Sequence, residues 1–548
     1  MEKERKYLTK IICHPERCHS CKASSNSSCM KQQRENTEFQ RVILFEPTRG
    51  YIHFISDEKN IPTGPPWETM EWESVFIGND TINSIRNQEI IDIYIVEPYI
   101  VIFTQKGMKT YFQAYPYLRT ALEVSMIQYL SDQITNEAGK LSSRIEIDKK
   151  ISQIQKDALS EISSYIPEMD THIQKRLSVL ISHKSTILEQ IIPLILDDLV
   201  EEIFLDHPNS NIYFDHASWG RCHSYITING HDAKRIITLI RSVSNYHLDR
   251  TNPSLKTEIS FLGVGLRLSA ALPPLSAKGL NLEIRRAKKK PLSMKDLILN
   301  GTLPYDAAAL LLIAVNLRYN ITITGAPGAG KTTLLNALDM TTPEIWRKIY
   351  IEDAIESRLC DEHHQVIIRV DPFDETVGRL DKKSEIVKTL HRSPDYLILG
   401  EIQTAEHTQA LFQAMAAGLR SIQTAHSNSA SNLITRWRKN HEIDMSNLAM
   451  MDLIVTVDKP HPGVSERYVT EIVEIEREEN SKGIVRFLSL NTLYRRETGI
   501  EKWSSKGAFL KRFEKSREVL EEMFYSLINL IQSGEPYSTW TELFFQYL

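Results

Sequence analysis

A glycine-rich segment at residues 325–332, Gly-Ala-Pro-Gly-Ala-Gly-Lys-Thr, constrains the fold of this chain more than any other feature. It follows the segment Asn-Ile-Thr-Ile-Thr at 320–324, which we expect to form a buried strand, and it precedes a helix-forming stretch at 333–338. In this order of strand, loop and helix, the pattern forms a phosphate-binding loop, or P-loop. The sequence therefore predicts a parallel α/β sheet in the second half of the chain, with short strands that alternate with helices.

The chemistry of such a loop follows from its residue types. Glycines let backbone N–H groups turn inward around phosphate oxygens, and the helix N-terminus adds a positive dipole. Lys331 would place a cation on the β- and γ-phosphates, and the hydroxyl of Thr332 would hold Mg²⁺. We expect nine residues to bind the nucleotide: Gly325, Ala326, Pro327, Gly328, Ala329, Gly330, Lys331, Thr332 and Thr333.

Two carboxylates follow apolar runs that we predict to be parallel strands. Glu352 follows the run that ends at Ile351, and Glu401 follows the run at 396–399. Ligands of open α/β sheets bind at the carboxyl ends of the strands, where the P-loop also lies. His426 comes after a further strand-like segment at 420–425. From the residues alone, a structural histidine and a γ-phosphate sensor are equally good interpretations of His426.

Four segments, 325–333, 351–353, 394–401 and 424–426, occur in the order and spacing of motifs that the chain shares with a known family. It resembles the type II/type IV secretion ATPases, which include pilus assembly and archaellum motors. The proline in the P-loop and the segment 414–418 are more similar to the archaeal branch. The resemblance implies a RecA-like motor domain with a parallel sheet, preceded by α+β N-terminal domains. It also implies Mg²⁺-dependent hydrolysis of ATP.

The resemblance assigns roles to individual residues. Glu352 is the expected base or water-positioning acid, Glu401 supports the metal and the water, and His426 senses the γ-phosphate. Arginines of such proteins stabilise transition-state charge, often across a subunit boundary. The candidates for this role are Arg267, Arg285 and Arg286, and the alternative for each is a surface salt bridge. Gln403 stands where the family usually has arginine, so the chemistry of the subunit interface is in question.

The resemblance also implies partners and a place in the cell. It implies a homo-hexamer that acts on a polytopic membrane platform protein of a pilus, archaellum or secretion machine. We expect a cytoplasmic protein held at the inner face of the membrane through partners, because no stretch reaches the ~20 apolar residues of a membrane span. The net charge of −5 gives no reason to expect a nucleic-acid partner. The alternatives are a nucleotide-switched, non-catalytic assembly scaffold and a nucleic-acid translocase.

Shifts in composition and pattern divide the 548 residues into five predicted parts. They are a Cys-rich metal-binding or flexible segment (1–36), a β-rich or α+β N-terminal domain (37–135), a helical segment with a small α+β, PAS-like domain (136–290), the RecA-like ATPase domain (291–460) and a C-terminal extension or cap (461–548).

Four of the six cysteines stand within the first 30 residues, at Cys13, Cys18, Cys21 and Cys29. Four thiolates suffice for tetrahedral Zn²⁺ or for an iron–sulfur cluster. The first three cysteines have the C-x₄-C-x₂-C spacing of plant-type ferredoxins, but Cys29 is much closer than that fold would place it, so we favour zinc over iron–sulfur. Zinc sites more often have two C-x-x-C pairs and only one is present here, and a flexible tail with free thiols is the alternative. The motor chemistry requires no such metal.

Overall fold

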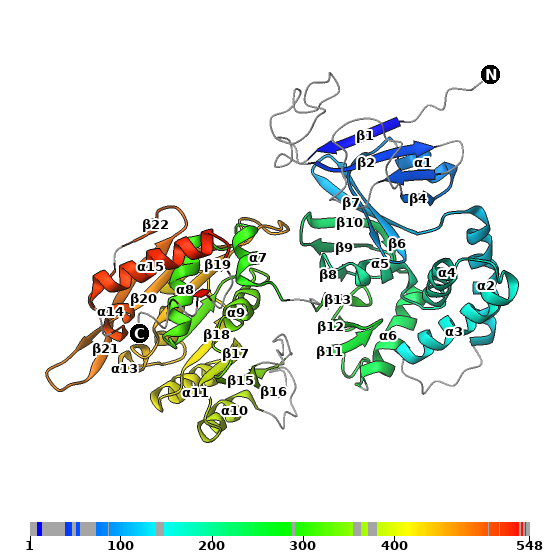
Figure 1. Cartoon of the computed structure of the whole chain (residues 1–548). Helices are drawn as coiled ribbons and strands as arrows, with labels where there is room; N and C mark the ends of the chain where they lie inside the picture. The colour runs from blue at the N-terminus through cyan, green and yellow to red at the C-terminus, as the bar shows by residue number, and fades with distance from the viewer. Residues whose placement is uncertain are drawn as a thin grey trace, which may run out of the picture. The chain divides into compact units, whose positions relative to one another are not determined.

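The computed structural model describes residues 8–13, 39–46, 51–54, 73–85, 87–138, 147–244, 246–287, 291–353, 363–370, 381–501, 503–513, 516–535, 539–540 and 543. The chain divides into two compact units, residues 1–289 and residues 290–548 (Figure 1). In the part of the chain described, no helix is long and apolar enough to cross a membrane.

Two sheets organise the first unit. The described strands β1 (Leu8–Cys13), β2 (Phe39–Glu46), β3 (Tyr51–Phe54) and β4 (Glu73–Phe76) pair antiparallel in chain order. A second sheet has the order β11-β12-β13-β8-β9-β10-β7-β6-β5. Its strands are β5 (Glu89–Val96), β6 (Tyr99–Lys106), β7 (Lys109–Pro116), β8 (Val200–Leu205), β9 (Asn211–His216), β10 (Gly220–Thr227), β11 (Ser254–Phe261), β12 (Val264–Ala271) and β13 (Asn281–Arg286).

The second sheet continues across the domain boundary predicted at 135/136. Strand β7 pairs in parallel with β10 over Thr110–Phe112 and Cys222–Ser224, although the two strands lie about a hundred residues apart in sequence. Alternate residues of β12 and β13 are buried, as a period-2 pattern requires for a strand with one face on the core. The predicted parts 37–135 and 136–290 therefore share one sheet and one hydrophobic core.

Helices cover this sheet. Helix α4 (Thr171–Lys184) packs against both α2 (Ala121–Ala138) and α3 (Ile147–Tyr165). Helix α6 (Gly230–Ser244) buries Ala233, Ile236 and Ile240, which lie three and four residues apart and therefore on one face. The remaining helices of this unit among the described residues are α1 (Asn79–Ile85) and α5 (Ile192–Leu196).

The second unit is built on one mixed sheet in the order β16-β15-β17-β18-β14-β19-β20-β21-β22. The strands from β16 to β19 are parallel, and β20 to β22 continue the sheet antiparallel. Their bounds are β14 (Ile321–Thr324), β15 (Arg347–Glu352), β16 (His364–Arg369), β17 (Tyr396–Ile402), β18 (Ser421–Ala425), β19 (Leu453–Asp458), β20 (Tyr468–Glu479), β21 (Val485–Arg495) and β22 (Gly499–Ile500).

Helices flank this sheet, and the central strand β14 is buried along its whole length. They are α7 (Met294–Leu299), α8 (Tyr305–Asn316), α9 (Lys331–Asp339), α10 (Lys382–Lys388), α11 (Ala405–Ala416), α12 (Ala430–Lys439), α13 (Met445–Leu448), α14 (Ala508–Arg512) and α15 (Arg517–Gln532). The predicted α/β class with a parallel sheet is confirmed. Residues 468–500 of the predicted C-terminal part extend this same sheet, and α15 packs against the buried helix α8.

Candidate nucleotide site

The parallel strands bring the predicted site segments to one edge of the sheet. The P-loop, residues 325–330, connects the end of β14 to the start of α9. Glu352 is the last residue of β15, Glu401 lies near the end of β17, and His426 directly follows β18. Because β14, β15, β17 and β18 run in the same direction, their carboxyl ends meet at this edge.

Two glycines of the P-loop occupy positions that a side chain would disturb. A Cβ on Gly325 would overlap the carbonyl oxygen of Val457 in the neighbouring strand β19. Gly330 has φ +96° and forms the N-cap of α9, a backbone conformation that L-residues with side chains rarely adopt. Both glycines therefore allow the backbone to fold into a tight cradle, which suits a phosphate group.

Lys331 lies inside this cradle with only 7% of its surface exposed. Its ammonium donates to the carbonyl oxygens of Gly325, at 3.1 Å, and Ala326, at 2.9 Å. The Nζ atom also lies 3.1 Å from Nδ1 of His426. Thr332 and Thr333 follow in the first turn of α9, and both are half-buried. The backbone carbonyls of the P-loop therefore hold the ammonium of Lys331 within the loop.

His426 connects Lys331 to Glu401. Its Nδ1 faces the lysine ammonium, and its Nε2 contacts Oε1 of Glu401. A neutral imidazole with its proton on Nε2 satisfies both neighbours, because Nδ1 then accepts from Lys331 and Nε2 donates to the carboxylate. The side chains of Lys331, His426 and Glu401 thus form a continuous contact chain over the P-loop.

Glu401 is held as a carboxylate. Burial by itself would raise the pKa of Glu401, but hydrogen bonds from His426 and from Gln403, together with the charge of Lys331, lower it to about 2. The Gln403 bond, from Nε2 to Oε2 of Glu401, measures 3.0 Å. Glu401 is therefore ionised at neutral pH and acts there as an acceptor. The glutamine that departs from the family pattern is one of its partners.

Glu352 and Asp353 lie next to Glu401 at the end of β15. Glu352 is 2% exposed, and a Cβ on Gly400 would lie 3.5 Å from its Cγ. Lys382 on α10 joins the two acidic segments, because its Nζ lies 2.9 Å from Oδ1 of Asp353 and 3.0 Å from the carbonyl oxygen of Glu401. Lys382 is nearly buried, and sequence reasoning missed it because a lysine in a polar helix resembles a solvated surface residue.

Arg436 on α12 is a second residue that sequence reasoning missed. Its guanidinium donates to the carbonyl oxygens of His426 and Gln403, both at 2.7 Å. These bonds connect the segments after β18 and β17 and so hold His426 beside Glu401. The only sequence signal was its place on the polar face of an amphipathic helix, which does not single out one cation.

The three candidate arginines belong to the first unit, on β12 and β13. Arg286 is 5% exposed, donates to the carbonyl oxygen of Ile195 at 2.7 Å and pairs with Asp198. Arg267 lies 3.6 Å from its cross-strand neighbour Glu258, and Arg285 is exposed. Among them, Arg286 is engaged most firmly within its own unit.

Two metal sites were predicted, one for Mg²⁺ at the P-loop and one at the N-terminal cysteines. For Mg²⁺, the hydroxyl of Thr332 at the start of α9 and the ionised Glu401 are oxygen donors of the kind this ion prefers. For the cysteine cluster, Cys18, Cys21 and Cys29 fall outside the described residues, and of Cys13 the structure describes only the backbone in β1. Across the described positions, no group of three His, Cys, Asp or Glu side chains is arranged for a metal ion.

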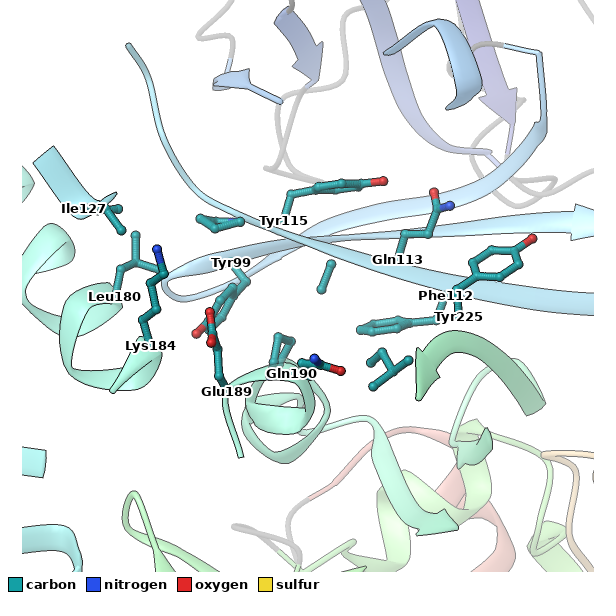
Figure 2. A pocket seen from close by; sticks show the side chains of 14 residues that line it. Tyr99, Phe112, Gln113, Tyr115, Ile127, Leu180, Lys184, Glu189, Gln190 and Tyr225 are labelled. Atoms are coloured by element: carbon teal, nitrogen blue, oxygen red, sulfur yellow. The ribbon is translucent and has the colours of Figure 1, made fainter. Parts of the chain in front are cut away.

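The first unit contains a separate cavity of about 430 Å³ (Figure 2). The rings of Tyr99, Phe112, Tyr115 and Tyr225 line it, with Glu189 and Lys184 nearby. Burial raises the pKa of Tyr115 to about 12, so its hydroxyl stays protonated. This aromatic lining lacks the glycine cradle and the buried ammonium of the P-loop edge, which is the better site for a polyphosphate.

Known proteins resemble part of this chain. The model of the type II/IV secretion system protein family matches residues 185–456. An uncharacterized protein of Methanocaldococcus jannaschii is 31% identical over 233 residues, which cover 40% of this chain and 31% of that protein. A probable conjugal transfer protein TrbB of Sinorhizobium fredii is 25% identical over 299 residues, which cover 52% of this chain and 86% of that protein. The chain thus spans about a third of the first relative and most of the second.

Solved structures match about half of the chain. The VirB11 ATPase from the Brucella suis type IV secretion system, in complex with sulphate, is 21% identical with a TM-score of 0.27, over 52% of this chain and 92% of that one. The Legionella pneumophila ATPase DotB is 17% identical with a TM-score of 0.39, over 53% and 79%. Residues 185–456 of this chain therefore belong to the type II/IV secretion system protein family.

Proposed function

We propose that this chain is an Mg²⁺-dependent ATPase motor that powers pilus or archaellum assembly, or type II/IV-like protein secretion. The observation that carries the proposal is the contact chain from Lys331 through His426 to Glu401 above the P-loop. In this contact chain, Lys331 offers a terminal phosphate a cation, His426 offers it a polar contact, and the ionised Glu401 is a hydrogen-bond acceptor. The family supports a role in a secretion or pilus machine.

In the proposed reaction, the P-loop N–H groups and Lys331 bind the phosphates. Glu352, which is buried at the end of β15 beside Gly400, orients the attacking water and accepts its proton. Glu401 stays ionised because His426 and Gln403 hydrogen-bond to it, so it accepts hydrogen bonds and does not itself supply a proton. Mg²⁺, held by Thr332 and supported by Glu401, would neutralise charge on the phosphates.

His426 would report the state of the nucleotide. Its Nδ1 contacts Lys331, and the carbonyl of the same residue accepts from Arg436 on α12. A displacement of Lys331 toward a γ-phosphate would change its contact with His426. Because Arg436 of α12 donates to the His426 carbonyl, the change would be transmitted to α12. In the proposed machine, a homo-hexamer transmits such changes to a polytopic membrane platform protein at the inner face of the membrane. The location that we propose for the motor is the cytoplasm.

The experiment is a steady-state assay of phosphate release by the full chain with Mg-ATP, beside a measurement of its mass in solution. We expect Glu401→Gln to lower kcat about 100-fold or more while ATP still binds, because the acceptor is lost and the cradle is kept. Glu478→Gln, an exposed position on β20, is the matched control and should leave kcat within about twofold.

Two results would contradict the proposal. Turnover that persists in Glu401→Gln would show that hydrolysis does not depend on Glu401 and its edge of the sheet. Wild-type protein that binds Mg-ATP but does not release phosphate would favour the nucleotide-switched scaffold instead.

A further inference from the structure

The connection between β19 and β20 lies against the P-loop. Strand β19 pairs in parallel with β14 and ends beside it, with Thr324 opposite Thr456. The chain then leaves the sheet at Lys459 and returns at Arg467, immediately before Tyr468, which pairs with Asp458. Both ends of this connection, residues 459–467, therefore emerge next to the segment that begins at Gly325.

The side chain of Arg467 crosses the outer side of the P-loop. Its Nε donates to the carbonyl oxygen of Gly328 at 3.0 Å, across 139 positions of sequence. A Cβ on Gly330 would lie 3.2 Å from the Cδ of Arg467, and one on Gly328 would lie 4.0 Å from the Nζ of Lys459. Arg467 is half-buried, and its bond to Gly328 lies at the surface of the unit.

The N–H at the other side of the same peptide is linked to Lys331 through one carbonyl oxygen. The carbonyl of Gly328 and the N–H of Ala329 belong to one trans peptide and point in opposite directions. The N–H of Ala329 donates to the carbonyl oxygen of Ala326 at 3.2 Å, and that oxygen also accepts from Lys331 at 2.9 Å. Arg467 therefore binds the peptide whose N–H donates to the Ala326 carbonyl, and this carbonyl also accepts from Lys331.

We propose that Arg467 is a positioning residue for the P-loop: by binding the Gly328 carbonyl, it fixes the 328–329 peptide, and with it the Ala326–Ala329 turn that holds the ammonium of Lys331, in the form that receives the phosphates of a nucleoside triphosphate. This inference rests on the proposed function. It adds that nucleotide affinity depends on the β19–β20 connection of the same chain. A change in that connection would then alter binding without touching Lys331 or Glu401.

The energetic argument is one of preorganisation. If the 328–329 peptide is free to rotate, part of the binding energy is spent on ordering it, and affinity falls. The guanidinium of Arg467 itself need not touch the nucleotide. Loss of the guanidinium should raise Kd and KM for Mg-ATP, while kcat changes little because Lys331, Glu352 and Glu401 remain in place.

The test uses the full chain with Arg467→Met, Arg467→Lys and a matched control, Arg347→Met. Arg347, at the start of β15, also donates its Nε to a backbone carbonyl, that of Arg392 at 3.2 Å, but it lies at the other end of its strand from the P-loop edge. Titration calorimetry with Mg-ATP gives Kd, and steady-state phosphate release gives kcat and KM.

We expect Arg467→Met to raise Kd and KM about tenfold with kcat within about twofold of wild type. Arg467→Lys, which keeps a donor, should recover most of the affinity, and Arg347→Met should change neither constant. An unchanged Kd in Arg467→Met, or a lysine variant as weak as the methionine variant, would overturn the inference. If Lys331→Ala still abolishes binding in that case, only this inference fails. If wild type binds no nucleotide, the proposed function fails with it.

Discussion

Gly325→Ala should disable the P-loop through one steric conflict. The added methyl group would overlap the carbonyl oxygen of Val457 and lie 3.2 Å from its carbonyl carbon. Strand β19, which contains Val457, pairs with β14 on one side and with β20 on the other, so its backbone cannot easily move away. The loop must shift instead, and the φ of +154° at Gly325 adds backbone strain.

The magnitude follows from these two contributions. Overpacking costs about 1–3 kcal/mol, and a side chain in a strained backbone conformation costs about 1–2 kcal/mol more, for a total of about 2–5 kcal/mol. Gly418→Ala is the matched control, because Gly418 has φ +97° in the same unit but nothing within 4 Å of an added Cβ. It should cost only the strain, about 1–2 kcal/mol.

Hydrogen exchange in increasing urea, read on peptides from β14 and β19, measures the stability of the second unit in the full chain. With a urea slope of about 3 kcal/mol per M, the clash of about 1–3 kcal/mol should lower the midpoint by about 0.3–1 M relative to Gly418→Ala. Calorimetry with Mg-ATP should show at least about tenfold weaker binding for Gly325→Ala only. If the two alanine variants are equally stable and bind equally well, the steric argument is wrong.

Three further predictions concern other residues. Lys382→Met should destabilise the second unit by roughly 2–3 kcal/mol and lower kcat, because Asp353 loses its buried partner and the Glu401 backbone loses a donor; urea unfolding and turnover measure this, and Lys383→Met, an exposed position of α10, should have no such effect. Arg286→Met should destabilise the first unit by about 2–4 kcal/mol, since Asp198 and the Ile195 carbonyl lose their donor, and a variant with normal stability and no turnover would instead favour a catalytic role. Burial lowers the pKa of His216 to about 4, below its usual 6.5, so the unfolded state binds more protons and the first unit should lose up to about 3 kcal/mol as pH falls from 6.5 to 4; hydrogen exchange of β9 at pH 7.5 and 5 tests this, and equal protection at both values would contradict it.

Local patterns were sufficient to predict the parts of the site that lie close in sequence. The order of strand, loop and helix around Gly325 and Lys331 is a local signal, and the structure contains β14, the loop and α9 there. Glu401 and His426 were expected at one sheet edge because each follows an apolar run. The structure has them in contact.

Residues that act across long sequence separations were not predictable in this way. Arg467 reaches Gly328 only because β19 is the neighbour of β14, and Lys382 reaches Glu401 only because α10 packs against β15, the neighbour of β17. In the sequence, both are ordinary cations in polar segments. The sheet order also decides that residues 468–500 extend the motor sheet, whereas the sequence pattern suggested only an extension or cap.

The most direct test of the central claim is a calorimetric titration of the full chain and of Lys331→Ala with Mg-ATP. The account predicts one site per chain in the wild type and an affinity at least about 100-fold weaker in the variant, because the ammonium that lies in the cradle is removed. Equal affinity in the two proteins would show that the nucleotide does not bind at Gly325 to Thr332.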